Sequence, residues 1–593
     1  MRSIESYISE MEKWLNQFIN FVVSHPLVGT WYTGIARFLF PILALMILSR
    51  AIRSLLKVPH APELWAQLNM PNGGSVMLSR WENIIGRSTF ADVVVNYPTI
   101  SRQHAALIRD ENEVWQVHDL DSKGGTAVNG KPVKGSTQVK VGDTISLGGV
   151  PLVLLPLTLE EEELQQSRRQ KEKPSSLWPS FFWLTIFQVL ACLQLIITST
   201  DTVTLTVPLV FLAFTLIMWI YYAALRVSRC VGFEMETIAF FLSTLSLSIT
   251  ASSAPKSLLK QFIAVILGLL LFLILGIFLR NLDRIKKIRW QMAACAIGLL
   301  AITVILGQVK NGAANWISLG SFSFQPSELA KICYIFAGSA TLDRLFRRRN
   351  IRLFILLTGI CILCLALMGD FGTAAIFFVT FVVISYLRSG DFATISLICG
   401  GAVFAGFLLL KFKPYISNRF AAWGHVWEYT STTGYQQTRT MSAAASGGLF
   451  GLGSGEGWLR YISAANTDLV FGMLCEEWGL IIAVLAVLAI ITLAIFAVRA
   501  CRVGRSSYYT IAACAASALF VFQTSLNVFG SVDILPLTGV TFPFVSNGGS
   551  SMMSAWGLLA FLKATDTREN ASFAIRRFAP KRTRKEAMPY EKN

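Results

Sequence analysis

Apolar runs of about 20 residues occur along most of the chain and predict helices that cross a membrane. The first run follows a polar N-terminal stretch that contains Glu10, Glu12 and Lys13, and the last run ends near Lys563. Together the runs predict about 13 spans. The expected spans are 34–56, 177–199, 203–225, 233–252, 258–280, 289–308, 326–343, 352–369, 371–387, 392–412, 469–498, 507–529 and 540–562.

One block of ordinary polarity interrupts the apolar pattern. Short runs such as ADVVVNY and EVWQVHDL alternate there with Gly, Asn and Asp, which predicts an all-β sandwich. The expected fold class is therefore an all-α polytopic membrane protein with one β domain. The expected segments are 1–60 with one span, the sandwich 61–157, a charged linker 158–176, two additional spans in 177–232, a membrane core 233–563 and a basic tail 564–593.

The composition excludes a soluble enzyme. Of the 593 residues, 53% are hydrophobic and 15% are charged, whereas soluble proteins carry about 25% charged residues. The net charge of +17 could indicate nucleic-acid binding. However, Lys and Arg are concentrated in alternate short connections such as 280–289 and 344–352, as is typical of cytoplasmic loops. We therefore expect no nucleic-acid partner, a cytoplasmic sandwich and C-terminus, and an extracytoplasmic 413–468 loop.

Four turn motifs of the sandwich follow one another in a specific order. They are GRS at 86–88, SRQH at 101–104, SKGGT at 122–126 and NG at 129–130. In this order they resemble the forkhead-associated (FHA) domain. The resemblance implies a domain that binds phosphothreonine, and hence a phosphorylated protein partner from a Ser/Thr kinase pathway.

The resemblance also assigns roles to residues of these turns. Arg87 and Ser101 would hold the phosphate, while Arg102 and Lys123 would add positive charge, because a dianionic phosphate favours guanidinium and hydroxyl donors. His104 is expected to support the loop rather than bind the ligand. Gly124 stands where the family usually has Asn, which could weaken peptide binding. An alternative is an FHA fold that serves only in packing.

Four polar clusters lie in or beside the membrane core, where polar groups are costly and therefore candidates for function. The first, QPSELAK, places Glu328 and Lys331 at i and i+3, so that they can form an ion pair. The others are GDFGTA at 369–374, the loop from GYQQTRT to EEWGL, and LPLTGVTFPFVSNGGSS at 535–551.

In this order the four clusters resemble the SEDS family (FtsW/RodA/SpoVE). The resemblance covers about 233–563 and implies a core of about ten spans. It further implies a peptidoglycan glycosyltransferase that polymerises lipid II at the outer face of the bacterial cytoplasmic membrane. A class B penicillin-binding protein is the partner that the resemblance implies. The functional Asp of the family corresponds to Asp468, with Glu476 and Glu477 following it.

The chemistry of the implied reaction is consistent with a single carboxylate. A β-1,4 bond made from an α-linked sugar diphosphate requires inversion, so Asp468 is expected to act as the general base on the acceptor hydroxyl. The diphosphate leaving group requires cations, either from side chains or from a divalent ion such as Mg²⁺ or Mn²⁺, whose ligands are unknown. The residues expected to contact the substrate are Glu328, Lys331, Arg419, Gln436, Arg439, Ser546 and Ser550.

Two further functions remain open at this point. A flippase for lipid-linked precursors would need a continuous polar path across the bilayer, but the polar clusters are concentrated in the outer half. A non-catalytic scaffold for a cell-wall complex would not need Asp468 within an intact motif. Asn315 and Asn547 depart from the usual family residues at their positions, which leaves the details of the donor site open.

Overall fold

The computed structural model describes most of the chain. The described residues are 2–57, 62–89, 91–110, 113–171, 175–198, 204–310, 313–320, 322–340, 348–389, 392–412, 420–501, 503–568 and 570–574. Each expected span corresponds to a helix. These helices are α2 (Pro26–Lys57), α4 (Trp178–Thr198), α5 (Thr206–Val227), α6 (Glu234–Ser253), α7 (Leu258–Phe278), α8 (Leu282–Leu306), α9 (Pro326–Ser339), α10 (Arg348–Met368), α11 (Phe371–Ser389), α12 (Phe392–Phe412), α16 (Gly479–Ala500), α17 (Ser507–Ser531) and α18 (Gly549–Ala564).

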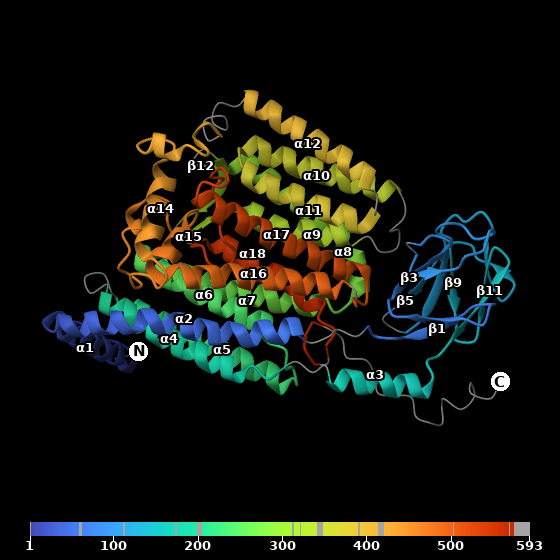
Figure 1. Cartoon of the computed structure of the whole chain (residues 1–593), viewed down its shortest axis with the longest axis horizontal. Helices are drawn as coiled ribbons and strands as arrows, with labels where there is room; N and C mark the ends of the chain where they lie inside the picture. Colours follow the sequence, from blue (N-terminus) through green and yellow to red (C-terminus); the bar gives the residue numbers. More distant parts are fainter. Residues whose placement is uncertain are drawn as a thin grey trace.

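The lengths of these helices support a membrane protein. Among the described residues, nine helices are long and apolar enough to cross a bilayer. The apolar stretches of α10 and α12 are shorter, and α9 and α18 have 14 and 16 residues. The number of spans therefore stays a prediction. The long helices lie side by side, and the apolar window of α6 is completely buried among them (Figure 1).

Three elements differ from the expectations. The polar N-terminal stretch forms an amphipathic helix, α1 (Arg2–Ser24), with Trp14 and Phe21 exposed. A three-stranded meander precedes α9 and consists of β12 (Gln308–Lys310), β13 (Ala313–Leu319) and β14 (Phe322–Phe324). The span expected from 540 begins as a helix only at Gly549, and the segment before it lies in the candidate site described below.

The polar block is an all-β sandwich, as expected. Its two sheets have the strand orders β2-β1-β11-β10-β7-β8 and β4-β3-β5-β6-β9. Leu68, Leu107 and Ile145 are among the fully buried residues between the sheets. The strands are β1 (Ala66–Asn69), β2 (Ser75–Leu78), β3 (Glu82–Gly86), β4 (Val93–Val94), β5 (Ala105–Arg109), β6 (Trp115–Asp119), β7 (Thr126–Val128), β8 (Lys131–Pro132), β9 (Ser136–Val139), β10 (Thr144–Leu147) and β11 (Val150–Leu155).

The sandwich contacts the helical bundle at the start of α17. Glu63 forms an ion pair with Arg505. The buried carboxylate of Glu82 accepts hydrogen bonds from the Ser506 hydroxyl and from the Ser507 main-chain N–H, each at 2.8 Å. The sandwich therefore supplies acceptors for donors at a helix N-terminus that have no partner within the helix. The linker between the sandwich and α4 contains α3 (Leu159–Lys171).

Candidate functional site

A cavity of about 230 Å³ lies where the segment after β12, the start of α11 and the segment before α18 meet. Asp468 lines this cavity, together with two further carboxylates, Glu328 and Asp370. The loop helix α14 (Tyr435–Gly447) and the short α15 (Val470–Met473) lie at the same end of the bundle, and the sandwich lies at the opposite end (Figure 1). The uncharged polar residues of the lining are Asn315, Gln325, Thr373, Thr467, Thr538, Thr541, Asn547, Ser550 and Ser551.

Buried polar groups hold the backbone around Asp468. The side-chain amide of Asn527 donates to the main-chain oxygens of Asp468 at 2.9 Å and of Val540 at 2.8 Å. The hydroxyl of Ser546 donates to the main-chain oxygen of Thr467 at 2.6 Å. These contacts tie the Asp468 loop both to α17 and to the segment before α18. Because their main-chain acceptors are fixed, the backbone that carries the carboxylate is positioned before any substrate enters.

Gly539 also shapes the space beside this carboxylate. It has φ of +70°, a conformation that favours glycine. A β-carbon at this position would lie 3.4 Å from the Asp468 Oδ2 atom. A larger side chain would therefore be strained and would occupy the cavity next to the carboxylate.

Asp370 is a residue of the site that the sequence indicated only as part of GDFGTA. Its Oδ2 atom accepts hydrogen bonds from Asn315 at 2.8 Å and from Gln325 at 3.3 Å, and its Oδ1 atom accepts from the Thr373 main chain at 3.0 Å. Asn315, noted in the sequence as a departure, therefore orients this second acid. Asp370 itself lies at the N-terminal end of α11, where a negative charge is stabilised.

Glu328 and Lys331 form the predicted ion pair, with 2.8 Å between Nζ and Oε1. Lys331 also donates to the Gln523 side chain at 3.2 Å, and the Gln523 amide donates to Thr541 of the cavity wall at 2.9 Å. The pair is buried, because the side chains of Lys331 and Glu328 are 1% and 6% exposed. Glu328 lines the cavity but Lys331 does not, so Lys331 acts on the site through its neighbours in this structure.

The other described residues expected to contact the substrate are spread over the same end of the bundle. Ser550 lines the cavity, whereas Ser546 lies behind it in contact with the Asp468 loop. Gln436 donates to the Ser463 main-chain oxygen at 3.0 Å. Arg439 is exposed on α14, with its guanidinium carbon 5.4 Å from the centre of the Tyr435 ring. Arg419 lies outside the described residues.

Glu476 and Glu477 hold the chain segment that follows α14. Glu476 accepts from the main-chain N–H groups of Trp458 at 2.9 Å and Leu459 at 3.1 Å. Glu477 accepts from the Ser252 hydroxyl at 3.0 Å and from the Gly455 N–H at 3.2 Å. Both carboxylates are buried in a turn of π-helix at Leu474–Trp478, and their acceptor atoms face this segment and α6.

The carboxylates do not form a metal cage built by the protein alone. Within the described ranges, no group of three or more His, Cys, Asp or Glu side chains could hold a metal ion. Mg²⁺ is usually bound by one or two carboxylates together with water and substrate phosphates. The carboxylates that line the cavity are compatible with this second arrangement, in which the substrate supplies ligands.

A second candidate site lies on the loops of the sandwich. The Arg87 main-chain N–H donates to the Ser101 carbonyl at 3.0 Å, and the Lys123 N–H donates to the Ser101 hydroxyl at 3.1 Å. The loops that carry the predicted phosphate ligands therefore lie side by side. Arg87, Arg102 and Lys123 are all exposed. Three cationic side chains at adjacent loops make a surface suited to a dianionic phosphate.

His104 and Gly124 support these loops from below. The buried His104 ring accepts from the Ser101 N–H at 3.1 Å, and its other nitrogen lies 3.0 Å from the Gly125 carbonyl oxygen. At Gly124, a β-carbon would lie 2.8 Å from both the Gly148 Cα atom and the Thr99 oxygen. The Asn that is usual in FHA domains would not fit here without a shift of these loops.

Comparisons with known proteins identify relatives of both parts of the chain. The family of cell cycle proteins FtsW/RodA/SpoVE matches residues 233–571, and the FHA domain matches residues 83–148. Both resemblances drawn from the motifs are thereby confirmed.

Individual relatives match about half of the chain. A probable peptidoglycan glycosyltransferase FtsW of Tolumonas auensis is 33% identical over 328 residues, which are 52% of this chain and 85% of that protein. The protein of the same description from Wigglesworthia glossinidia brevipalpis is 29% identical over 328 residues, covering 53% and 83% of the two chains. Among solved structures, a chain of a peptidoglycan synthase complex is 25% identical and is covered to 98%, against 57% of this chain, with a TM-score of 0.49.

Proposed function

Because the chain belongs to the FtsW/RodA/SpoVE family of cell cycle proteins, we propose that it is a peptidoglycan glycosyltransferase. Its substrate is lipid II, which it polymerises at the outer face of the cytoplasmic membrane. The observation that carries this proposal is the position of Asp468, which lines a cavity with two further carboxylates at the end of the bundle opposite the FHA domain (Figure 1). Basic connections at the FHA end support a cytoplasmic position for that domain.

Asp468 acts as the general base in the proposed reaction. It removes the proton from the acceptor sugar hydroxyl, whose oxygen then bonds to the anomeric carbon of the donor. The bond from that carbon to the diphosphate oxygen breaks on the opposite face, so the configuration inverts and the polyprenyl diphosphate leaves with the bonding electrons. The hydrogen bonds from Asn527 and Ser546 fix the loop that presents the base, which reduces the entropy cost of aligning the two reactants.

The surroundings of Asp468 indicate how the leaving group is stabilised. Among the described lining residues there is no Lys or Arg, and Lys331 is paired with Glu328 behind the wall. A divalent cation held by carboxylates and by the diphosphate itself would supply positive charge. Among the cations expected to contact the substrate, Arg439 on α14 is the other described one, and its side chain is exposed.

The FHA domain gives the enzyme a second binding function. We propose that Arg87, Ser101, Arg102 and Lys123 bind a phosphothreonine of a partner protein in a Ser/Thr kinase pathway. A class B penicillin-binding protein is the proposed partner in the membrane, since glycan strands must be crosslinked once they are polymerised.

Polymerisation of purified lipid II by the full-length protein tests the enzymatic proposal. Asp468→Asn should abolish glycan formation while the protein stays folded. Asp533→Asn is the matched control, because Asp533 is an acid of the same region that accepts from the Gly424 N–H and does not line the cavity. Polymerisation at the wild-type rate by Asp468→Asn would reject Asp468 as the base. Movement of lipid II across liposome membranes without polymer formation would favour a flippase.

A further inference from the structure

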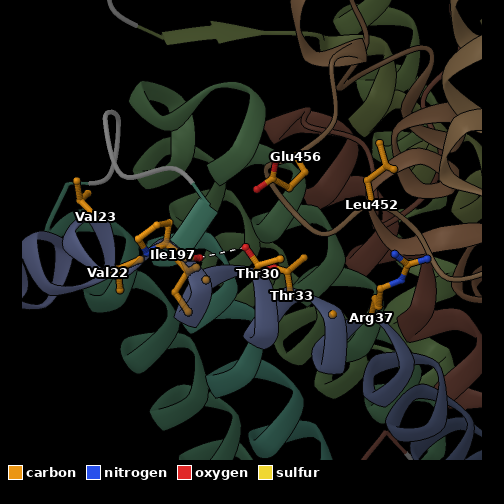
Figure 2. Close-up of a pocket in the computed structure, with 11 residues that line it drawn as sticks. Val22, Val23, Thr30, Thr33, Arg37, Ile197, Leu452 and Glu456 are labelled. Carbon is orange, nitrogen blue, oxygen red and sulfur yellow. Dashed lines mark hydrogen bonds between the residues drawn. The ribbon is translucent and has the colours of Figure 1, made fainter.

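A second and larger cavity is lined mostly by residues that precede the family match at 233–571, together with Leu452 and Glu456 from within it. It has a volume of about 610 Å³ and is lined by α2, by the ends of α1 and α4, and by the segment that contains Leu452 and Glu456. Figure 2 shows Thr30, Thr33 and Arg37 on α2, with Leu452 and Glu456 on the segment that faces them. This cavity is separate from the one that Asp468 lines, because the two share no lining residue.

Arg37 is the cationic residue that lines this cavity. It lies inside a helix that is long and apolar enough to cross the membrane, where a cation is costly unless it has a counter-charge. Its Nε atom is buried without a hydrogen-bond acceptor, and within the described part of the chain its side chain forms no ion pair. Such an arginine is suited to an anionic ligand that the chain itself does not supply.

Arg37 lies in the outer half of the membrane. From Arg37 to Arg50, the next cationic residue of α2, the helix rises roughly 20 Å at 1.5 Å per residue, which is less than the hydrocarbon core of about 30 Å. With the end of α2 at Lys57 on the cytoplasmic side, the backbone of Arg37 is therefore below the outer headgroup layer. A long arginine side chain at this depth can reach the phosphate level of the outer leaflet.

Two further features of the cavity select the type of headgroup. The Thr33 hydroxyl oxygen accepts from the Gln194 amide at 2.9 Å, so its hydrogen can be donated to a phosphate oxygen. Glu456 brings a negative charge to the same cavity and is exposed there. A ligand with a phosphate alone would be repelled by this carboxylate, whereas a ligand that also carries an ammonium group would satisfy both charges.

The surface next to the cavity is suited to acyl chains. Along α2, Ile35, Ile42 and Leu45 are 63%, 56% and 56% exposed. Ile35 precedes Arg37, and Ile42 and Leu45 follow it along the helix toward the bilayer centre. Lipid chains that extend from a headgroup in the cavity would cover them, because apolar surface is favourably removed from water or polar headgroups.

We propose that this cavity binds the headgroup of a zwitterionic phospholipid of the phosphatidylethanolamine class. Arg37 and Thr33 bind the phosphate and Glu456 binds the ammonium. The bound lipid joins α2 to the 452–459 segment, whose backbone is held by Glu476 and Glu477. This proposal does not depend on the glycosyltransferase function, since it concerns a cavity and a ligand that take no part in the sugar transfer.

Native mass spectrometry of the delipidated full-length protein tests this proposal. The probes are dioleoyl phosphatidylethanolamine, dioleoyl phosphatidylglycerol with the same acyl chains, and undecaprenyl diphosphate. We expect one molecule of phosphatidylethanolamine to bind with at least tenfold higher affinity than phosphatidylglycerol. Arg37→Gln should lower this affinity at least tenfold, and Arg37→Lys should restore part of it. Arg50→Gln is the matched control, because Arg50 is an exposed arginine further along the same helix.

Each other outcome contradicts the proposal. Equal affinity of the wild type for both phospholipids would exclude a role for the ammonium group, as would an unchanged preference in Glu456→Gln. Preferential binding of undecaprenyl diphosphate would assign the cavity to the polyprenyl carrier instead. If Arg37→Gln did not fold, the lipid preferences of the wild type and of Glu456→Gln would still test whether the cavity binds phosphatidylethanolamine. All of these measurements are of binding, so a protein without polymerase activity gives the same test.

Discussion

Asn527 donates a hydrogen bond of 2.9 Å from its side chain to the main-chain oxygen of Asp468. Asn527 belongs to α17, and a second hydrogen bond from the same amide holds Val540 on the other side of the cavity. Both acceptors are main-chain atoms, so this contact fixes the backbone on two sides of the cavity without occupying the carboxylate. A buried residue of a membrane helix therefore holds the main chain that carries the proposed base.

Replacement of Asn527 by Ala should lower the rate of polymerisation while Asp468 remains present. Loss of a buried donor leaves two carbonyl groups unpaired, which costs about 1–3 kcal/mol, and 1.4 kcal/mol corresponds to about tenfold in rate. We expect kcat for lipid II polymerisation to fall about tenfold to a hundredfold, with a smaller change in KM. Ser525→Ala is the control, since the Ser525 hydroxyl donates only to the Val521 carbonyl of its own helix. A wild-type kcat in Asn527→Ala would show that the backbone position does not limit the reaction.

The buried pair of Glu328 and Lys331 should be important for stability as well as for the site. Lys331→Met leaves the Glu328 carboxylate buried without its counter-charge, and breaking such a pair costs about 3–5 kcal/mol. The double variant Glu328→Gln with Lys331→Met should recover a large part of this loss. Chemical unfolding of the protein in detergent measures the difference. Lys256→Met, which alters an exposed lysine, serves as the control, and additive losses in the double variant would contradict a direct coupling.

The sequence allows prediction of those features that depend on local pattern. Apolar runs determine where helices form, so each expected span corresponds to a helix. The i, i+3 spacing of Glu328 and Lys331 likewise predicts their ion pair. The start of α18 was expected too early, because the residues from 540 are apolar enough for a helix although Pro543 and the following glycines delay it until Gly549.

Contacts between distant segments could not be predicted in this way. Asn527 is one polar residue in an apolar helix, and its spacing from Asp468 gives no indication that they meet. The contact of Glu82 with Ser506 joins residues more than 400 positions apart. The amphipathic α1 was not expected, because Glu and Lys interrupt its apolar residues and no continuous run remains. Amphipathic periodicity would have been the signal for it.

Binding of phosphopeptides should depend on the loop cations of the FHA domain. A phosphothreonine peptide should bind the full-length protein at least tenfold more tightly than the same peptide without phosphate, since charge-assisted hydrogen bonds form only with the phosphate. Arg87→Ala should remove most of this preference in isothermal titration calorimetry. Lys140→Ala is the charge-matched control, because Lys140 is an exposed lysine outside the predicted phosphate ligands. Equal binding of both peptides by the wild type would instead indicate that the domain serves only in packing.

Contact between the FHA domain and α17 should depend on Glu82 and on pH. Burial raises the pKa of the Glu82 carboxyl above its ordinary value, while the hydrogen bonds from Ser507 and Ser506 partly oppose this shift. An acid whose pKa is raised in the contact state stabilises that state fully when the pH is below the ordinary pKa of the free acid. This contribution is lost as the pH rises through the raised pKa. We therefore expect the contact to weaken as the pH rises from the ordinary pKa of a glutamic acid to the raised pKa of Glu82.

Amide hydrogen exchange of residues 503–510, corrected for the intrinsic rate at each pH, measures this contact. Protection in the wild type should decrease as the pH rises. Glu82→Ala should lower protection at every pH, because the N–H of Ser507 and the hydroxyl of Ser506 lose their acceptor. Glu82→Gln should keep partial protection that no longer varies with pH, since the amide offers one acceptor and no titratable proton. Glu160→Ala on α3 is the control for an exposed acid. Identical protection in Glu82→Ala and the wild type would mean that other contacts hold the FHA domain against α17.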